Sequence, residues 1–483
     1  MLTLILLLIP IVSGSWLLSM KESANLALSK NVALASSLLV FIGSVYLYTN
    51  AGNASITSFQ VNWIESLAIT FHLAVDGISL LLILLTTLLT PLIVLASSKW
   101  NYTNPQRLLG LVLLTEAALI GVFSAQDVFL FYFFFEAALI PVYFIAAVWG
   151  GENANRITFK MFVYTIFGSL FMLVAIVYLY VKGSSSDIST LATFAPSLSG
   201  TEQGFLFGAF IIALAIKMPL FPLHTWQPDA YTESPTPATM LLSGLLSKMG
   251  VYGLIRIAVP FFPVAVEQFG FSIMILAIIG LIYGSIIAVQ QDNMKRLVAY
   301  SSFAHMGLMA AGVLTGTIEG TQGAIFQMFA HGVNAIGLFY VVQVIHERTG
   351  TYSLSALGGI TQKTPVLTIY FMIILLGSVA LPLTNGFVGE FVLLKSVFEY
   401  HYLLGGIAGL TIIFGAVYML RLMQKSMFGA LNSTTEGFKD IAGTEAFVLF
   451  PIALIVIATG VFPNSILQLT EPAVIQLLTG IIK

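Results

Sequence analysis

The sequence has no cysteine, and this absence excludes several kinds of chemistry at once. Without thiols, the chain can form no disulfide, no thiolate metal site and no iron–sulfur ligation. It also lacks the GxGxxG and GxxxxGK[ST] patterns, whose glycine-rich loops bind the phosphates of nucleotides. Redox or nucleotide chemistry within this chain is therefore not expected.

Charged residues are scarce as well. They make up 8% of the 483 residues, whereas hydrophobic residues make up 58%, and the mean hydropathy is +0.97. This composition is typical of an integral membrane protein. The net charge is −2, so nucleic acid is not an expected partner, whereas lipid is.

Long apolar runs fill most of the chain and predict an all-α membrane protein. A spanning helix needs roughly 20 mostly apolar residues. We predict fourteen, at residues 2–20, 31–49, 77–97, 107–124, 128–149, 160–181, 204–226, 236–258, 270–289, 297–315, 322–344, 365–396, 402–424 and 444–463. The first should be retained, because no Lys or Arg precedes Lys21 and a secretory signal peptide begins with basic residues. Near 56–75, apolar and polar residues alternate, which predicts a β-hairpin outside the membrane.

Lys and Arg are divided unequally between the predicted loops. The loops that follow odd-numbered helices carry Lys21, Lys30, Lys99, Arg107, Arg156, Lys160, Lys295, Arg296, Arg348, Lys363, Arg421, Lys425 and Lys439. The even side carries only Lys182, Arg256 and Lys483. By the positive-inside rule, the odd loops face the cytoplasm and both termini face the outer, periplasmic side.

Two predicted helices contain a break. Helix seven is interrupted at KMPLFP, residues 217–222, and helix twelve at LPLTNGF, residues 381–387. The breaks are five helices apart, and five is odd, so helices four to eight and nine to thirteen would form two inverted repeats, as in many secondary transporters. We therefore expect helices one to three with the hairpin in residues 1–106, repeats at 107–258 and 270–425, and helix fourteen with a short tail at 444–483. Backbone groups freed at a break need protein or water, so both breaks should line a hydrated interior.

Ionisable side chains within these spans are the candidates for function, because a charge at mid-membrane costs about 3 kcal/mol on insertion scales. They are Glu116, Glu136, Lys217, Lys248 and Glu390, joined by His224, His305 and His331. A Glu and a Lys that meet in such a site can be switched between protonation states when one partner moves. The set therefore predicts a device that handles protons.

Each candidate also has a purely structural interpretation. The glutamates could make helix–helix contacts, the lysines could sit in static ion pairs, and a buried histidine is often only a hydrogen-bonded core residue. Lys395 lies near a helix end and is expected to snorkel. Three aspartates stand at helix starts or turns, where capping explains them: Asp76, Asp127 and Asp229.

Several segments resemble a known family. They are IKMPLFPLHTWQPDAYTESPTP, LLSKMGVYGLIR, DVFLFYFFFEAALIPVYF, QDNMKRLVAYSSFAHMG and QMFAHGVNAIGLF, within residues 76–425. They are similar to segments of the antiporter-like subunits of respiratory complex I and of the multisubunit cation/proton antiporters. The long coverage and the specific motifs identify the chain as a member of that family.

The resemblance implies roles for individual residues. It implies a pair of Glu136 on helix five with Lys217 on helix seven, a central Lys248 on helix eight, His305 and His331 leading across, and a terminal Glu390 on broken helix twelve. His224 falls where the family has its histidine after the PLFP break. Many members have a histidine after PDA, whereas this chain has Tyr231, which puts a relay role there in doubt.

The resemblance also points to one branch of the family. A glutamate on helix twelve resembles the M-type subunit, called subunit four in mitochondria, whereas the L-type and N-type subunits have lysine. About twenty residues follow helix fourteen, which leaves no room for the long lateral helix of the L-type subunit.

We therefore expect a proton-translocating subunit of NADH:quinone oxidoreductase in the bacterial inner (plasma) membrane. It would be a translocase without a redox centre of its own. NADH, FMN, iron–sulfur clusters and quinone would belong to other subunits, and L-type and N-type subunits would be neighbours.

Three alternatives remain open. The first is a subunit of a sodium/proton antiporter or of a membrane-bound hydrogenase complex, which would share the same ionisable residues. The second is a stand-alone transporter for an organic solute, which the sparse polar inventory disfavours. The third is a redox protein with His305 and His331 as haem ligands, for which the spacing gives little support.

Overall fold

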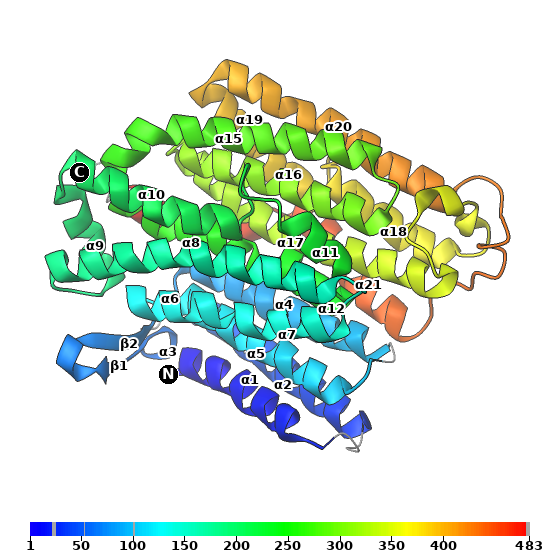
Figure 1. Ribbon diagram of the computed structural model, residues 1–483, viewed down its shortest axis with the longest axis horizontal. Coiled ribbons are helices and arrows are strands. Elements are labelled where there is room, and N and C mark those ends of the chain that lie inside the picture. The colour runs from blue at the N-terminus through cyan, green and yellow to red at the C-terminus, as the bar shows by residue number, and fades with distance from the viewer. Residues whose placement is uncertain (22–25, 53, 100–101, 480–483) are drawn as a thin grey trace.

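The computed structural model describes residues 1–483 apart from 22–25, 53, 100–101 and 480–483. The molecule is a bundle of long helices that lie side by side, with two strands protruding at one end (Figure 1). We call the end that carries β1 and β2 the hairpin end, and the other the opposite end. The amino terminus lies at the hairpin end, where the Met1 amine donates to the carbonyl oxygen of Ser58 over 2.9 Å.

The long helices follow the predicted spans closely. They are α1 (Leu2–Ser19), α2 (Leu26–Thr49), α4 (Gly77–Lys99), α5 (Pro105–Ser124), α6 (Val128–Ala137) with α7 (Leu139–Trp149), α8 (Ala154–Gly183), α10 (Gly200–Lys217), α15 (Pro263–Gln290), α16 (Met294–Leu314), α17 (Ile318–Thr349), α18 (Pro365–Ser378), α19 (Asn385–Tyr400), α20 (Tyr402–Met427) and α21 (Thr444–Val461). Shorter pieces are α3 (Ala54–Thr57), α9 (Ile188–Phe194), α11 (Gln227–Glu233), α22 (Asn464–Thr479) and the 3-10 turns η1 (Glu65–Leu67), η2 (Ala195–Ser197), η5 (Leu354–Ala356) and η6 (Ile360–Gln362).

The helix that carries Lys248 is irregular. It runs from Thr236 to Phe261 as α12 (Thr236–Leu241), η3 (Leu242–Leu246), α13 (Lys248–Gly253), η4 (Leu254–Ala258) and α14 (Val259–Phe261), where η3 and η4 are π-helical. Single π turns inside α-helices are frequent at functional sites. We call this composite element the Lys248 helix.

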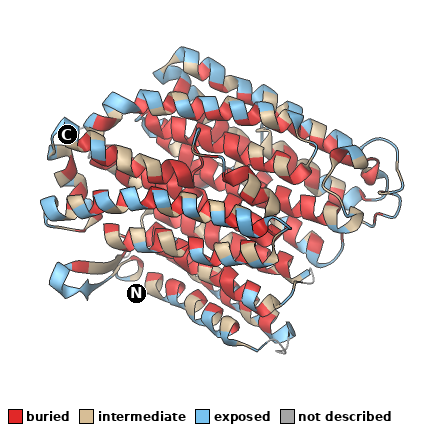
Figure 2. Cartoon of the chain, viewed as in Figure 1, coloured by how far each residue is buried: buried red, intermediate tan, exposed pale blue. Residues whose placement is uncertain are grey.

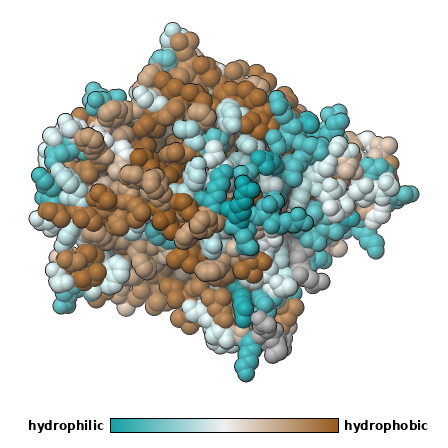
Figure 3. All heavy atoms as spheres, in the orientation of Figure 1, coloured by the Kyte–Doolittle hydropathy of each residue, from teal (hydrophilic) through white to brown (hydrophobic). Residues whose placement is uncertain are grey.

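The bundle is a multi-pass membrane protein. Thirteen helices of the described residues are long and apolar enough to cross a membrane. The Lys248 helix and α17 are buried along their spans, whereas α1, α2, α20 and α21 turn many apolar side chains outward (Figure 2). Figure 3 shows apolar side chains over most of the left and middle of one face, with hydrophilic ones gathered toward the right. An outer surface this apolar fits a lipid environment.

The predicted count of fourteen spans and the inverted repeats remain predictions. Helix α18 is too short to cross a membrane by itself. A fourteenth crossing would therefore have to combine α18 with α19. The break predicted at residues 217–222 is present, since α10 ends at Lys217; the rest of the predicted span, to residue 226, is non-helical and consists mainly of turns. Proline explains this end, because Pro219 and Pro222 lack the N–H that a continuing helix requires.

The short tail predicted after α21 contains a further helix. Most of it forms α22, which lies against α4 and α17. Its last described residues are at the hairpin end, where Gln476 and Leu477 share a cavity with Ala74 and Asp76. Lys483, which the loop-charge count places on the even side, lies outside the described residues.

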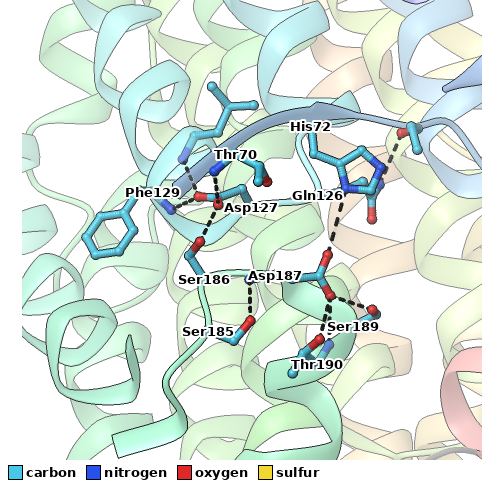
Figure 4. Close-up of polar contacts among 12 residues, drawn as sticks. Thr70, His72, Gln126, Asp127, Phe129, Ser185, Ser186, Asp187, Ser189 and Thr190 are labelled. Atoms are coloured by element: carbon cyan, nitrogen blue, oxygen red, sulfur yellow. Dashed lines mark hydrogen bonds and ion pairs between the residues drawn. The ribbon is translucent and has the colours of Figure 1, made fainter. Parts of the chain in front are cut away.

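Hydrogen bonds connect three loops at the hairpin end (Figure 4). The antiparallel strands β1 (Phe59–Ile64) and β2 (Ile69–Leu73) form the hairpin. Asp127 caps α6 by accepting from the N–H groups of Phe129 and Leu130, and it also accepts from the Ser186 hydroxyl over 2.5 Å. Asp187 caps α9 and lies 3.8 Å from Nδ1 of His72 on β2. The hairpin is thus fixed to the starts of α6 and α9.

Candidate functional site

The first break places a lysine at a helix end inside the bundle. Lys217 is the last residue of α10 and is buried, with 4% of its surface exposed. A cation suits this place, because the carbonyl groups at a helix C-terminus carry partial negative charge. Other side chains satisfy the freed backbone, since the Trp226 indole N–H donates to the carbonyl oxygen of Ile216 over 3.0 Å.

Lys217 and Glu136 make no direct ion pair among the described residues, and the functional pairing implied by the resemblance remains a prediction. The Lys217 ammonium donates to the carbonyl oxygen of Phe135 over 3.4 Å and lies 4.7 Å from the centre of the Phe135 ring. In the part of the chain that the structure describes, no ion pair links the two residues, and Oε1 of Glu136 is buried without a hydrogen-bond partner. Lys217 therefore contacts the residue next to Glu136, and the Glu136 carboxylate interacts electrostatically with its ammonium without a direct contact.

Lys248 lies at the centre of the bundle and contacts a histidine. It is fully buried, and its Nζ lies 2.7 Å from Nδ1 of His331 on α17. The same ammonium donates to the carbonyl oxygen of Ser243 over 2.5 Å and to the Ser247 hydroxyl over 3.3 Å. A buried cation needs such partners, because its desolvation is otherwise uncompensated.

Two further contacts extend from His331 to the second break. The rings of His331 and His305 have centroids 5.5 Å apart, and Nδ1 of His305 lies 3.0 Å from Oε1 of Glu390. That last distance suits an ion pair with a protonated imidazole, although the ring N–H is not aligned for a hydrogen bond. Lys248, His331, His305 and Glu390 therefore form a buried series, which we call the central row.

A small cavity lies beside the central row. It has a volume of about 10 Å³ and is lined by both histidines together with polar side chains such as Ser301, Gln327 and Asn334. This is about the space that one water molecule requires, and the lining supplies several hydrogen-bonding partners. A water molecule placed there would connect the two imidazoles.

The second break is shaped by close packing around Glu390. It separates α18 from α19, and Gln327 on α17 donates to Oε1 of Glu390 over 3.4 Å. Gly389 permits this approach, because a Cβ atom there would lie 2.3 Å from Oε1 of Gln327. Asn334 donates to Asn385 at the start of α19 over 3.1 Å, so a further polar contact joins the break to α17.

Two predicted site residues lie apart from this series. His224 is stacked on Phe303 with a centroid distance of 4.3 Å, and its ring also contacts Phe221 and Tyr283. Glu116 on α5 is fully buried, and neither of its oxygens has a hydrogen-bond partner among the described residues. No contact joins either residue to the central row within the described chain, and their part in a relay remains a prediction.

The sequence interpretation missed a polar region at the opposite end. A cavity of about 400 Å³ is lined by residues that include Glu233, Lys295, Gln343, Glu347 and Tyr352. Lys295, which the sequence interpretation counted as a loop lysine, is only 3% exposed and donates to the carbonyl oxygen of Ser234. The QDNMK segment places a lysine directly after a helix cap, and nothing in that pattern distinguishes a buried lysine from a loop lysine.

Small hydroxyl side chains line the Lys248 helix between this cavity and Lys248. The Thr236 hydroxyl donates to Oε1 of Gln343 over 2.5 Å, Thr239 follows, and the Ser243 hydroxyl lies 3.1 Å from that of Ser302. Ser247 is the last before Lys248. Their spacing of three or four residues, T-x-x-T-x-x-x-S-x-x-x-S, was the signal available in the sequence.

The fold and this buried series of Lys, His and Glu between two interrupted helices define the class of antiporter-like membrane subunits. A family model described as "NADH:quinone oxidoreductase/Mrp antiporter, TM" matches residues 125–415. No group of three or more His, Cys, Asp or Glu side chains suited to a metal ion occurs within the described residues.

Comparison with individual relatives identifies the family within this class. "NADH-quinone oxidoreductase subunit M" of Rickettsia prowazekii is 38% identical over 455 residues, covering 93% of this chain and 93% of the relative. "NADH-ubiquinone oxidoreductase chain 4" of Chondrus crispus is 35% identical and covers 94% of this chain and 93% of the relative. A chain in the structure of respiratory complex I from Thermus thermophilus with bound NADH has a TM-score of 0.92 at 32% identity, with 100% of both chains covered. The chain therefore belongs to the NADH-quinone oxidoreductase subunit M family.

Proposed function

We propose that this chain is the proton-translocating M-type subunit in the membrane arm of an NADH:quinone oxidoreductase, a respiratory complex I. It would be a translocase subunit of the respiratory chain with no redox centre of its own. NADH, FMN, iron–sulfur clusters and quinone would be bound by other subunits, whose electron transport drives the pumping. L-type and N-type antiporter-like subunits would be its membrane neighbours.

The central row is the observation that carries this proposal. Four protonatable side chains are buried together where a membrane protein tolerates ionisable groups only at a cost of about 3 kcal/mol each. The row reaches from the middle of the Lys248 helix to the break before α19. A static structural role would not require two histidines in succession between a lysine and a glutamate.

A proton would move along the row by successive transfers. The Lys248 ammonium gives its proton to Nδ1 of His331, which must be neutral to accept it. His331 passes a proton through the small cavity to His305, and His305 passes one to Glu390, from which it leaves on the outer side. Moving one charge against 100 mV needs about 2.3 kcal/mol, so the energy must arrive from neighbouring subunits.

Glu136 and Lys217 would act as the switch that starts these transfers. In the structure the two are apart, with Lys217 held by the Phe135 carbonyl. When Glu136 approaches, the ammonium is stabilised, and when it leaves, the ammonium can release its proton. Because Lys217 ends a helix, its backbone can move without disturbing a continuous run of helical hydrogen bonds.

Protons would be taken up from the opposite end. The 400 Å³ cavity there has a polar lining, and the hydroxyl groups of Thr236, Thr239, Ser243 and Ser247 continue that lining to Lys248. The loop charges support a cytoplasmic location for this end and a periplasmic one for the hairpin end and both termini. The membrane would be the bacterial inner membrane.

Mass spectrometry of the intact native assembly tests the proposal. Peripheral flavin and iron–sulfur subunits should accompany the chain, together with two sister antiporter-like subunits. An assembly that contains only antiporter subunits would contradict the assignment to complex I and support a cation/proton antiporter. A membrane-bound hydrogenase would instead bring a metal-containing hydrogenase subunit.

A further inference from the structure

A second large cavity lies at the hairpin end of the Lys248 helix. It has a volume of about 460 Å³, and its lining comes from the start of α4, the Lys248 helix, α9 and α22, with Asp76, Gln126, Ser189, Arg256 and Gln476 among the polar residues. Arg256 and Asp76 form an ion pair of 2.5 Å at its wall. The cavity thus brings a polar space to the same helix that carries the central lysine.

The distance from this cavity to Lys248 is short. Arg256 follows Lys248 by eight residues on one helix, and at 1.5 Å per residue this corresponds to about 12 Å. Tyr252 stands midway, four residues from each. If water reached past this point, Lys248 would be open to both sides of the membrane at once, and protons would flow back.

Tyr252 fills the space between the cavity and Lys248. It is fully buried, and its ring meets Phe123 edge-on at a centroid distance of 5.2 Å and Phe131 at 6.4 Å. Its hydroxyl donates to the carbonyl oxygen of Phe123 over 3.0 Å and lies 3.1 Å from the Ser79 hydroxyl. The ring is therefore fixed at both its apolar faces and its polar end.

The two sides of Lys248 differ in the size of the side chains that line the helix. Toward the opposite end, the polar positions are Thr236, Thr239, Ser243 and Ser247, which all carry small side chains. Toward the hairpin end, the equivalent place is taken by an aromatic ring packed against two others. An apolar constriction of this kind excludes water and so blocks proton conduction.

We propose that Tyr252 is a seal that separates the hairpin-end cavity from Lys248 and prevents protons from leaking back to it. This inference rests on the proposed function, since a leak matters only if Lys248 carries protons. The phenol acts by volume and position: its hydroxyl, committed to Phe123 and Ser79, keeps the ring across the gap. Tyr252 thus acts as a barrier and neither accepts nor donates the transferred protons.

Proton leak in the purified whole complex tests the seal. Complexes with Tyr252→Ser, Tyr252→Phe or unchanged Tyr252 would be reconstituted in liposomes, and passive proton flux would be followed with a pH dye without NADH. We expect Tyr252→Ser to raise the leak at least several-fold, with quinone reductase activity retained and no longer stimulated by uncoupler. Tyr252→Phe keeps the ring and should stay within about twofold of the unchanged complex. Tyr340→Ser, which removes another fully buried tyrosine ring from α17, is the matched control and should not leak.

Two outcomes of this experiment would overturn the seal. A Tyr252→Ser complex that is as tight as the unchanged one shows that the ring blocks nothing. A Tyr252→Phe complex that is tight but no longer pumps shows that the hydroxyl is a relay, so that the hairpin-end cavity is an outlet.

Thiol labelling gives an answer even where a variant loses activity, because the chain has no cysteine of its own. In assembled complexes, a membrane-impermeant thiol reagent at the hairpin end should label Thr193→Cys, which lines the cavity, and spare Ser247→Cys beyond the seal. Adding Tyr252→Ser should expose Ser247→Cys to the reagent. Equal labelling of both single-cysteine variants would contradict the seal. Labelling does not depend on pumping, so it separates failure of the seal from failure of the proposed function.

Discussion

The Nζ atom of Lys248 lies 2.7 Å from Nδ1 of His331, so the two groups share one hydrogen bond and cannot both be protonated at those atoms. Whichever residue carries the proton, the other must present a lone pair. A small shift of one proton across this contact moves a positive charge from the Lys248 helix to α17 without any large movement of the backbone.

The first prediction concerns His331. Replacing it with asparagine keeps a hydrogen-bond acceptor for Lys248 but removes a group that can carry a proton. We expect the His331→Asn complex to assemble normally and to pump about 10-fold or more below the unchanged complex, because a group that accepts and donates the proton is missing from the relay. Dye quenching in membrane vesicles measures the rate of pumping. His401→Asn, at the start of α20 and away from both the row and the uptake cavity, is the control. Full pumping by His331→Asn would remove His331 from the route.

A second prediction separates a switch from a static ion pair at Lys217. Methionine keeps the length and removes titration, whereas arginine keeps a charge that cannot be lost. If Lys217 must release its proton, Lys217→Met and Lys217→Arg should both depress quinone reductase activity and pumping several-fold. Near-normal pumping by assembled Lys217→Arg complexes would leave only the structural role.

The partner residue should show the same behaviour. Glu136→Gln is expected to resemble Lys217→Met, and the double variant should be less than additive, because both changes disable one device. The losses caused by the two single variants should overlap only in part, because the two side chains make no direct ion pair within the described residues. Fully additive losses, measured as pumping rates, would show that the two residues act separately.

A third prediction concerns the end of the row. Glu390→Ala should reduce pumping more than it reduces assembly, because it removes the partner of His305. Glu390→Gln keeps the shape and the contact with Gln327 while removing the charge, and it should pump as poorly as alanine. Lysine would repel a protonated His305, but the family resemblance implies lysine at this place in the L-type and N-type subunits, so Glu390→Lys should recover part of the rate. Unchanged pumping by Glu390→Ala would place the outlet elsewhere.

Membrane orientation gives a fourth prediction, which the absence of cysteine makes simple to test. Single cysteines at Ser58, beside the hairpin, and at Gly429, in the loop after α20, lie at the two ends of the bundle. An impermeant thiol reagent should label Ser58→Cys only in right-side-out vesicles and Gly429→Cys only in inverted ones. The reverse result would overturn the orientation inferred from the loop charges and the direction of pumping with it.

The fifth prediction is a pH dependence at the hairpin. The neighbouring His72 imidazole, with hydrogen bonds from Ser189 and Thr190, lowers the pKa of Asp187 against the opposing effect of burial. A carboxyl whose pKa is lowered on folding stabilises the folded state above its ordinary pKa of about 4, and this stabilisation is lost as the pH falls below that value. Because Asp187 is partly exposed, the contribution should be about 1 kcal/mol or less.

Chymotrypsin cleavage of the hairpin measures this contribution, since β1 and β2 contain aromatic residues and no Lys or Arg. At neutral pH, Asp187→Asn should be cleaved several-fold faster than the unchanged protein. Ser197→Ala, in the turn that follows α9, is the control. Equal cleavage of Asp187→Asn and the unchanged protein would show that the contact with His72 does not hold the hairpin.

Much of the fold could be predicted, because apolar length and proline act locally. The runs of about 20 apolar residues fixed most of the helices, and Pro219 and Pro222 marked the end of α10 at Lys217. The contacts of the central row could not be derived from residues alone. Lys248 and His331 are 83 positions apart, and only packing decides which buried groups meet. The same reason explains why Lys295 was taken for a loop residue.

The two π-helical segments on either side of Lys248 determine how the Lys248 helix would respond to the deletion of a residue. Each holds one residue more than an α-helical turn needs, so deleting one residue there would restore a regular helix rather than break it. The π-helical turn takes up its extra residue locally, so the helix on either side of the deletion would keep its orientation. Loss of one residue from Leu242–Leu246 would therefore leave Lys248 on the face of the helix that contacts His331. Among relatives of this chain, a one-residue gap at either segment is thus compatible with an unchanged central row.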